Sequence, residues 1–135
     1  MKKLLLVVAA LAPAFASAGT STWNVDPMHS RVGFAVKHLV ISTVRGEFKK
    51  YEGKVVLDDA DLTKSTVEAT IDPATIDTGV ADRDGHLRSP DFFDVAKNPS
   101  VTFKSTKVAA AGPGKLAVTG DLTLRGVTKP VVLDV

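Results

Sequence analysis

From residue 31 onward, apolar and polar residues alternate with a period of two along most of the chain. Segment 115–125 shows this most clearly, because its leucines and Val118 share one face while its threonines, Asp121 and Arg125 share the other. Such alternation is typical of β-strands that bury one face. The pattern predicts strands at residues 31–38, 43–48, 53–58, 65–72, 101–108, 115–125 and 131–135.

Turn signals separate these strands. Gly112-Pro113-Gly114 is the strongest, and turns are also expected at 58–61 and 125–128. The period shifts toward that of a helix only around residues 80–88, and Pro90 ends that segment. Short strands, short turns and a single short helix predict an all-β fold, which is either an antiparallel sandwich or a barrel.

Residues 1–18 have the three parts of a secretory signal peptide. Lys2 and Lys3 give a positive start, an apolar run follows, and Ala16-Ser17-Ala18 supplies a small-residue cleavage site. The run is shorter than the roughly 20 residues that a spanning helix needs. We therefore expect cleavage after Ala18 and export to the periplasm rather than the alternative, an uncleaved anchor. The remaining residues, 19–135, are predicted to form one domain.

Charge gives no reason to expect a nucleic-acid partner. The chain has 17 basic and 15 acidic residues, and removal of Lys2 and Lys3 would leave 15 of each. Nucleic-acid binding requires clustered positive charge. The chain also has no cysteine, so the fold must be stabilised by core burial and hydrogen bonding alone.

Several motifs, in order along the chain, resemble the YceI-like family. The most specific is DRDGHLRSPDFFD at residues 82–94. The others are DPMHS with the later KHL in residues 26–39, VRGEF at 44–48, ATID with IDTG in 69–79, and GDLTLRGVTKPV at 120–131. Together they span nearly all of residues 22–135.

The resemblance implies a lipocalin-like, extended antiparallel β-barrel that is periplasmic or secreted. It also implies a non-enzymatic carrier whose lumen holds a polyisoprenoid, an isoprenoid quinone or another long-chain amphiphile, with transient membrane contact. Family members continue with further strands, whereas this sequence stops at Val135 inside a strand pattern. We therefore expect a barrel that lacks its C-terminal strands, or one completed by a partner chain or as a homodimer.

The inward apolar faces of the predicted strands are the candidate lumen. Its predicted lining is Val32, Phe34, Val36, Phe48, Val67, Ile71, Phe103, Leu116, Val118, Leu122 and Leu124. The same residues would equally fill the solid core of an ordinary β-sandwich, so both interpretations stay open.

The segment 82–94 combines charged residues with two adjacent phenylalanines, and it is the candidate mouth of the lumen. The predicted mouth residues are Arg83, His86, Arg88, Phe92 and Phe93. Arginine suits a phosphate head group because its donors can bind two oxygens. The alternative is a packed loop in which Asp84 pairs with Arg88 at helical spacing and the phenylalanines plug the barrel.

The sequence predicts no catalytic residue, no metal site and no cofactor. His29, His38 and His86 match no zinc motif, and nucleophile elbows and phosphate-binding loops are lacking. Two alternatives to a lipid carrier remain. One is an interaction module whose open sheet pairs with a partner chain, and the other is an enzyme with a site built from His86, Asp84 and Arg88.

Overall fold

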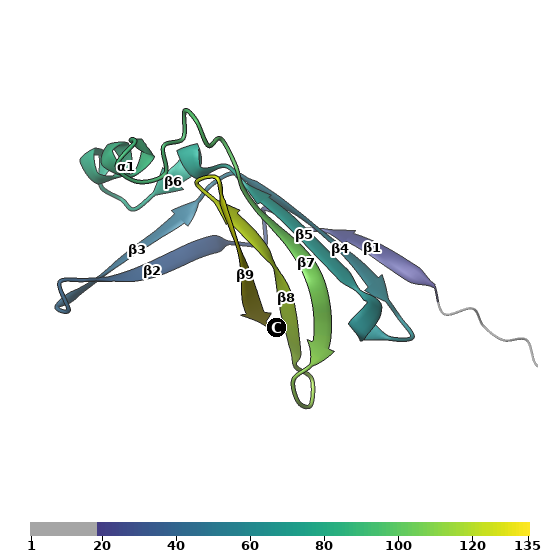
Figure 1. Ribbon diagram of the computed structural model, residues 1–135. Coiled ribbons are helices and arrows are strands. Elements are labelled where there is room, and N and C mark those ends of the chain that lie inside the picture. Colours follow the sequence, from purple (N-terminus) through teal and green to yellow (C-terminus); the bar gives the residue numbers. More distant parts are fainter. Residues whose placement is uncertain (1–18) are drawn as a thin grey trace, which may run out of the picture.

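The computed structural model describes residues 19–135, which form two antiparallel sheets and one α-helix (Figure 1). The larger sheet has the order β1-β4-β5-β7-β8-β9. Its strands are β1 (Thr20–Asn24), β4 (Tyr51–Asp58), β5 (Thr66–Ile71), β7 (Val101–Ala110), β8 (Leu116–Leu124) and β9 (Val127–Asp134). The smaller sheet consists of β2 (Val32–His38), β3 (Ser42–Phe48) and β6 (Ile76–Asp77). The helical elements are η1 (Leu62–Lys64), η2 (Pro73–Thr75) and α1 (Ala81–Arg88).

The all-β class with one short helix is therefore confirmed. The two sheets diverge: the β2–β3 hairpin runs away from β8 and β9, and α1 lies next to β6 at the end of the smaller sheet (Figure 1). Within residues 19–135 no strand pairing joins β2 to β9, so the sheets do not close into a barrel. The signal peptide predicted at residues 1–18 lies outside the described residues, and no helix of the described part is long and apolar enough to span a bilayer.

Three strands differ from the sequence-based expectation. β1 and β6 were not predicted, because one is short and polar and the other has only two residues. β9 begins at Val127 rather than residue 131, because Arg125 and Gly126 form a two-residue turn with φ of 48° and 72°. Leu124 thus pairs directly with Val127. Positive φ at both turn residues suits the twist of a tight hairpin.

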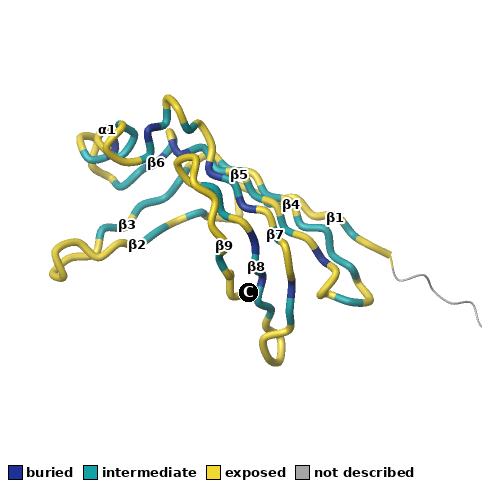
Figure 2. The backbone as a smooth tube through the Cα atoms, viewed as in Figure 1, coloured by how far each residue is buried: buried dark blue, intermediate teal, exposed yellow. Residues whose placement is uncertain are grey.

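The core lies on one face of the larger sheet. Buried positions gather along β7 and β8 (Figure 2), and Phe103, Val108 and Val118 form their centre. The Phe103 ring lies across Gly120 of the neighbouring strand. A Cβ atom at Gly120 would stand 2.4 Å from Cζ of Phe103 and 2.6 Å from the carbonyl oxygen of Lys104. Glycine at this position therefore makes room for the central core ring.

Candidate functional site

An apolar cavity of about 780 Å³ lies where the smaller sheet diverges from the larger one. Its wall comes from both sheets, from α1 and from the loop that follows α1. The residues are Phe34, Val36, His38, Val44, Phe48, Ile76, Arg83, His86, Leu87, Phe92, Phe93, Val101 and Leu124. The volume falls within the range of roughly 300–1,000 Å³ that is usual for small-molecule sites. Three other hollows, of about 290, 470 and 260 Å³, are smaller, and each has charged residues in its wall.

Strand alternation explains why one face of the β2–β3 hairpin lines this cavity. Phe34, Val36 and His38 are two residues apart and therefore point to the same side of β2. Val44 stands directly opposite Val36 and joins the same face. Gly46 stands opposite Phe34, and a Cβ atom there would lie 2.5 Å from Cζ of Phe34. The Phe34 ring can lie over β3 only because residue 46 has no side chain.

Aromatic contacts connect the hairpin to the loop after α1. The ring centroids of Phe34 and Phe48 are 5.8 Å apart, and Phe48 meets Phe93 edge-to-face at 5.8 Å. His86 meets Phe92 edge-to-face at 4.9 Å. These separations and angles are favourable for aromatic pairs. The cavity wall is thus continuous from β2 to the loop.

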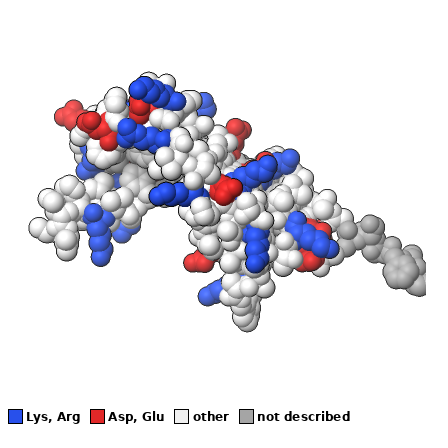
Figure 3. Space-filling model, viewed as in Figure 1, with Lys and Arg blue, Asp and Glu red and all other residues white. Residues whose placement is uncertain are grey.

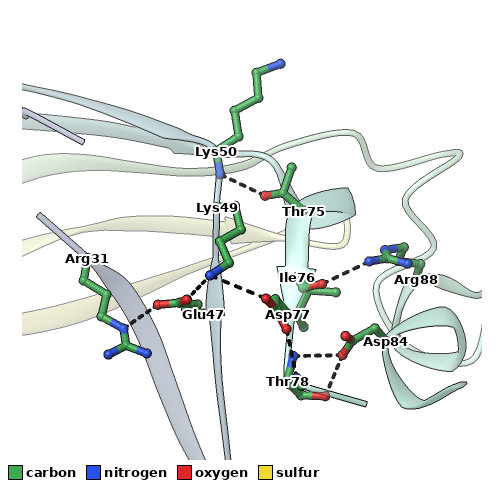
Figure 4. Close-up of polar contacts among 11 residues, drawn as sticks. Arg31, Glu47, Lys49, Lys50, Thr75, Ile76, Asp77, Thr78, Asp84 and Arg88 are labelled. Carbon is green, nitrogen blue, oxygen red and sulfur yellow. Dashed lines mark hydrogen bonds and ion pairs between the residues drawn. The ribbon is translucent and has the colours of Figure 1, made fainter. Parts of the chain in front are cut away.

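Helix α1 is held by side chains that reach the segment before it. The buried Asp84 carboxylate accepts hydrogen bonds from the Thr78 backbone N–H and hydroxyl, at 3.0 and 2.5 Å (Figure 4). Arg83 donates from Nε to the Thr78 hydroxyl and from Nη2 to the Thr78 carbonyl, at 2.8 and 2.9 Å. Arg88 donates to the carbonyls of Ala74 and Ile76, at 2.7 and 3.0 Å. The Asp84–Arg88 pair of the packed-loop alternative does not form, because each side chain binds residues 74–78 instead.

The loop after α1 is fixed from the opposite side of the cavity. Arg125, in the β8–β9 turn, donates from Nη1 to the Phe92 carbonyl at 2.8 Å and from Nη2 to the Pro90 carbonyl at 2.7 Å. The Phe93 backbone N–H donates to the carbonyl of Leu87 at 3.0 Å. Phe92 and Phe93 are therefore positioned by the larger sheet and by α1.

An ion-pair network stabilises the smaller sheet next to the cavity (Figure 4). Glu47 binds Arg31 at 2.5 Å and also binds Lys49, whose Nζ lies 3.4 Å from Oδ2 of Asp77. The hydrogen bond from Lys49, helped by the charge of Arg31, lowers the pKa of Glu47. The backbone N–H of Gly79, followed by Lys49, lowers the pKa of Asp77. Since Glu47 pairs with Asp77 across the strands, the network connects β3 to β6.

The cavity wall contains three side chains that can carry charge: His38, Arg83 and His86. Nε2 of His86 lies 2.9 Å from the Asp91 carboxylate. Arg83 uses Nε and Nη2 to bind Thr78, which leaves Nη1 available to a ligand. Within residues 19–135 no group of three or more His, Cys, Asp or Glu side chains is placed to hold a metal ion. The wall is suited to an apolar ligand with one polar end.

Comparison with known proteins identifies the family. Residues 23–135 match the family described as YceI-like domain. The chain belongs to the YceI-like family. It is 41% identical to a UPF0312 protein of Vibrio parahaemolyticus over 138 aligned positions, which cover 99% of this chain and 73% of that protein. A UPF0312 protein of Shewanella denitrificans is also 41% identical, over 98% of this chain and 72% of its own length.

Solved structures share the fold of this YceI-like chain. The crystal structure of Burkholderia cenocepacia BcnA matches with a TM-score of 0.77 and 34% identity, over 82% of this chain and 69% of BcnA. A Campylobacter jejuni YceI protein matches with a TM-score of 0.66 and 40% identity, over 82% and 64%. A polyisoprenoid-binding domain of Saccharophagus degradans matches at 0.52 with 19% identity, over 77% and 58%. This last likeness concerns the fold alone.

The YceI-like chain brings together about half of the residues that the sequence predicted for its site. Those on the cavity wall are Phe34, Val36, Phe48, Leu124, Arg83, His86, Phe92 and Phe93. Five predicted lumen residues instead pack in the core of the larger sheet, namely Val67, Phe103, Leu116, Val118 and Leu122. Val32 and Ile71 line a separate hollow of about 260 Å³, and Arg88 is not part of the cavity wall.

Five wall residues were not among the predicted site residues. They are His38, Val44, Ile76, Leu87 and Val101. Alternation gave a signal for Val44, which lies opposite Val36, and for Val101, which shares a face with Phe103. Ile76 had none, because a two-residue strand has no periodicity.

Proposed function

We propose that this YceI-like chain binds one long-chain amphiphile of the polyisoprenoid class in the cavity between its two sheets. The cavity itself carries the proposal. Its apolar wall is partly open to solvent, since Val36 is 55%, Phe92 47% and Leu124 43% exposed, and contiguous exposed apolar surface marks a binding site. An apolar cavity of about 780 Å³ with polar groups at a few points is the form that a site for an apolar ligand takes. The name of the Saccharophagus degradans domain points to the same class of ligand.

The geometry also assigns an orientation to the ligand. The hydrocarbon chain would lie against Phe34, Val36 and Leu124, and the polar end would face Arg83 and His86. Because Thr78 occupies two of the Arg83 nitrogens, Nη1 can donate to a single ligand oxygen rather than as a two-pronged fork. A quinone carbonyl or one oxygen of an isoprenoid phosphate fits this requirement.

Energetics favour a carrier or buffer for the lipid. Each buried methylene is worth about 0.8 kcal/mol relative to water, but a lipid that leaves a bilayer already had an apolar environment. The net hydrophobic gain of transfer is therefore small, and shielding from water is the main effect. We propose that the chain performs this role in the periplasm after export, without a chemical step.

A second candidate function rests on the sheet edges. In the described residues β9 ends the larger sheet, and Val127, Val132 and Leu133 on it are exposed. An unpaired edge strand has free backbone donors and acceptors, to which a strand of another chain can form hydrogen bonds. Pro130 weakens this candidate, since proline removes a backbone donor from the strand. A partner chain, or a second copy of this chain in a homodimer, would then bind at β9 rather than at the cavity.

Native mass spectrometry of the chain recovered from a periplasm separates the two functions. Val36 on the cavity wall and Val132 on β9 are matched in exposure, at 55% and 59%. We expect wild type and Val132→Glu to carry a lipid mass that organic extraction removes, and Val36→Glu to lack it. A wild-type chain without bound lipid, or equal occupancy in Val36→Glu, would contradict lipid binding here. A dimer that Val132→Glu dissociates would favour the edge-pairing function.

A further inference from the structure

The turn that joins β2 to β3 carries three consecutive aliphatic side chains in solvent. Leu39 is 75% exposed, Val40 95% and Ile41 92%. Within residues 19–135 this is the only run of three exposed large hydrophobic residues. Single exposed apolar residues are ordinary on protein surfaces, whereas contiguous patches mark interaction sites. We call Leu39, Val40 and Ile41 the hairpin tip.

Turn chemistry does not account for these residues. Leu39 and Val40 have φ of 52° and 63°, in the left-handed region that glycine and asparagine adopt most readily. A branched valine is strongly disfavoured there. The tip therefore presents aliphatic side chains at a position where the backbone alone would favour other residue types.

The part of the hairpin nearest the tip carries charge of one sign. Residues 32–46 contain Lys37 and Arg45 and no aspartate or glutamate. Lys37 stands opposite Thr43, and Arg45 opposite Ala35, so both cations lie on the face turned away from the cavity. No ion pair of residues 19–135 includes either of them. On the face seen in Figure 3, this end of the molecule has blue side chains behind an uncharged tip.

We infer that the hairpin tip docks on an anionic phospholipid bilayer. Leu39, Val40 and Ile41 would enter the boundary between head groups and acyl chains, and Lys37 and Arg45 would face the phosphates. An apolar end with cations behind it is the arrangement by which peripheral segments bind membranes. The opposite face of the hairpin lines the cavity through Val36, His38 and Val44. Docking would therefore bring the cavity beside the bilayer, although docking itself needs no cavity ligand.

A fluorescent label tests this contact directly, because the chain has no cysteine of its own. Val40→Cys and the control Val132→Cys, at an exposed position on β9 far from the tip, would each carry an environment-sensitive nitrobenzoxadiazole group. With vesicles of phosphatidylcholine and phosphatidylglycerol, we expect a blue shift and an intensity gain at position 40 and none at position 132. No change at position 40, or an equal change at both positions, would overturn the inference. Both variants share the same N-terminus, so residues 1–18 do not bias the comparison.

The cations are tested with unlabelled chains. Lys37→Ala with Arg45→Ala should weaken binding to the same vesicles by about tenfold or more. Lys107→Ala with Lys115→Ala removes the same charge near the β7–β8 turn and should leave binding unchanged. Equal losses in the two double variants would mean general charge attraction and would overturn the inference. The vesicles contain no prenyl lipid, so failure here is distinguishable from failure of cavity binding.

Discussion

The Asp84 carboxylate accepts hydrogen bonds from both the backbone N–H and the hydroxyl of Thr78, and it is only 7% exposed. This contact matters because α1 is short, contains Gly85 and has no side-chain cap at its N-terminus. Helices of such length are marginal in water by themselves. The helical wall of the cavity therefore depends on contacts with the preceding segment.

Replacing Asp84 should destabilise the protein measurably. Asp84→Ala leaves the two Thr78 donors without their acceptor in a partly buried site, at a cost of about 1–3 kcal/mol. Urea unfolding followed by circular dichroism measures this free energy. Asp82→Ala, in the exposed first turn of the same helix, is the control and should change stability by no more than about 0.5 kcal/mol. Equal effects would show that the Thr78 contact is not what holds α1.

Gly120 and Gly85 should respond in opposite directions to the same substitution. Gly120→Ala places a methyl group against the Phe103 ring and the Lys104 carbonyl, so we expect about 1–3 kcal/mol of destabilisation. Gly85→Ala meets no atom within 4 Å in a helix and should stabilise the protein by about 0.5–1 kcal/mol. Thermal unfolding of both variants measures the two changes in stability. A Gly120→Ala protein as stable as wild type would mean that Phe103 can repack freely.

The comparison of sequence and structure shows what periodicity can and cannot predict. Alternation predicted β2, β5 and β8 closely, because each keeps apolar residues on one face along most of its length. It also placed Phe34 and Phe103 on inward faces, but it could not show that the sheets diverge between them. Phe34 therefore lines the cavity whereas Phe103 lies in the solid core. Where an open space lies depends on how the sheets are placed relative to each other, and this information is not contained in any one strand.

The polar contacts that hold α1 could not be predicted from the sequence, for a related reason. Helical spacing suggested that Asp84 and Arg88 would pair, but their actual partners are Thr78, Ala74 and Ile76. Arg88 binds two backbone carbonyls. Because every residue has a carbonyl, the sequence does not indicate which of them a side chain will bind.

Stability should fall in acid, in part through Glu47 and Asp77. Folding lowers the pKa of both carboxyls. Their contribution is therefore present above the ordinary carboxyl pKa and is lost as the pH falls through the lowered folded-state pKa. Glu47→Gln should reduce stability at neutral pH and flatten its decline in acid, measured as urea midpoints across the pH range. Glu52→Gln is the control, because Glu52 is exposed and forms none of the ion pairs of the described residues. An unchanged pH profile in Glu47→Gln would contradict this assignment.

Arg125 should control the mobility of the loop after α1. Arg125→Ala removes the donors to the Phe92 and Pro90 carbonyls, so residues 89–98 should open more readily than in wild type. Hydrogen–deuterium exchange measures this as faster exchange of that segment with the sheets unchanged. Lys129→Ala, at an exposed position on β9, is the control. Unaltered exchange in Arg125→Ala would mean that the aromatic contacts alone hold the loop.

The central claim is that a polyisoprenoid-type ligand occupies the cavity between the two sheets. Photocrosslinking with a benzophenone-bearing isoprenoid, followed by peptide mapping, tests it most directly. We predict adducts on residues 34–38 of β2 and on residues 83–93 of α1 and its loop, and we predict their loss when unlabelled isoprenoid competes. Adducts confined to the outer face of β4 and β5, or adducts that competition does not reduce, would contradict the claim.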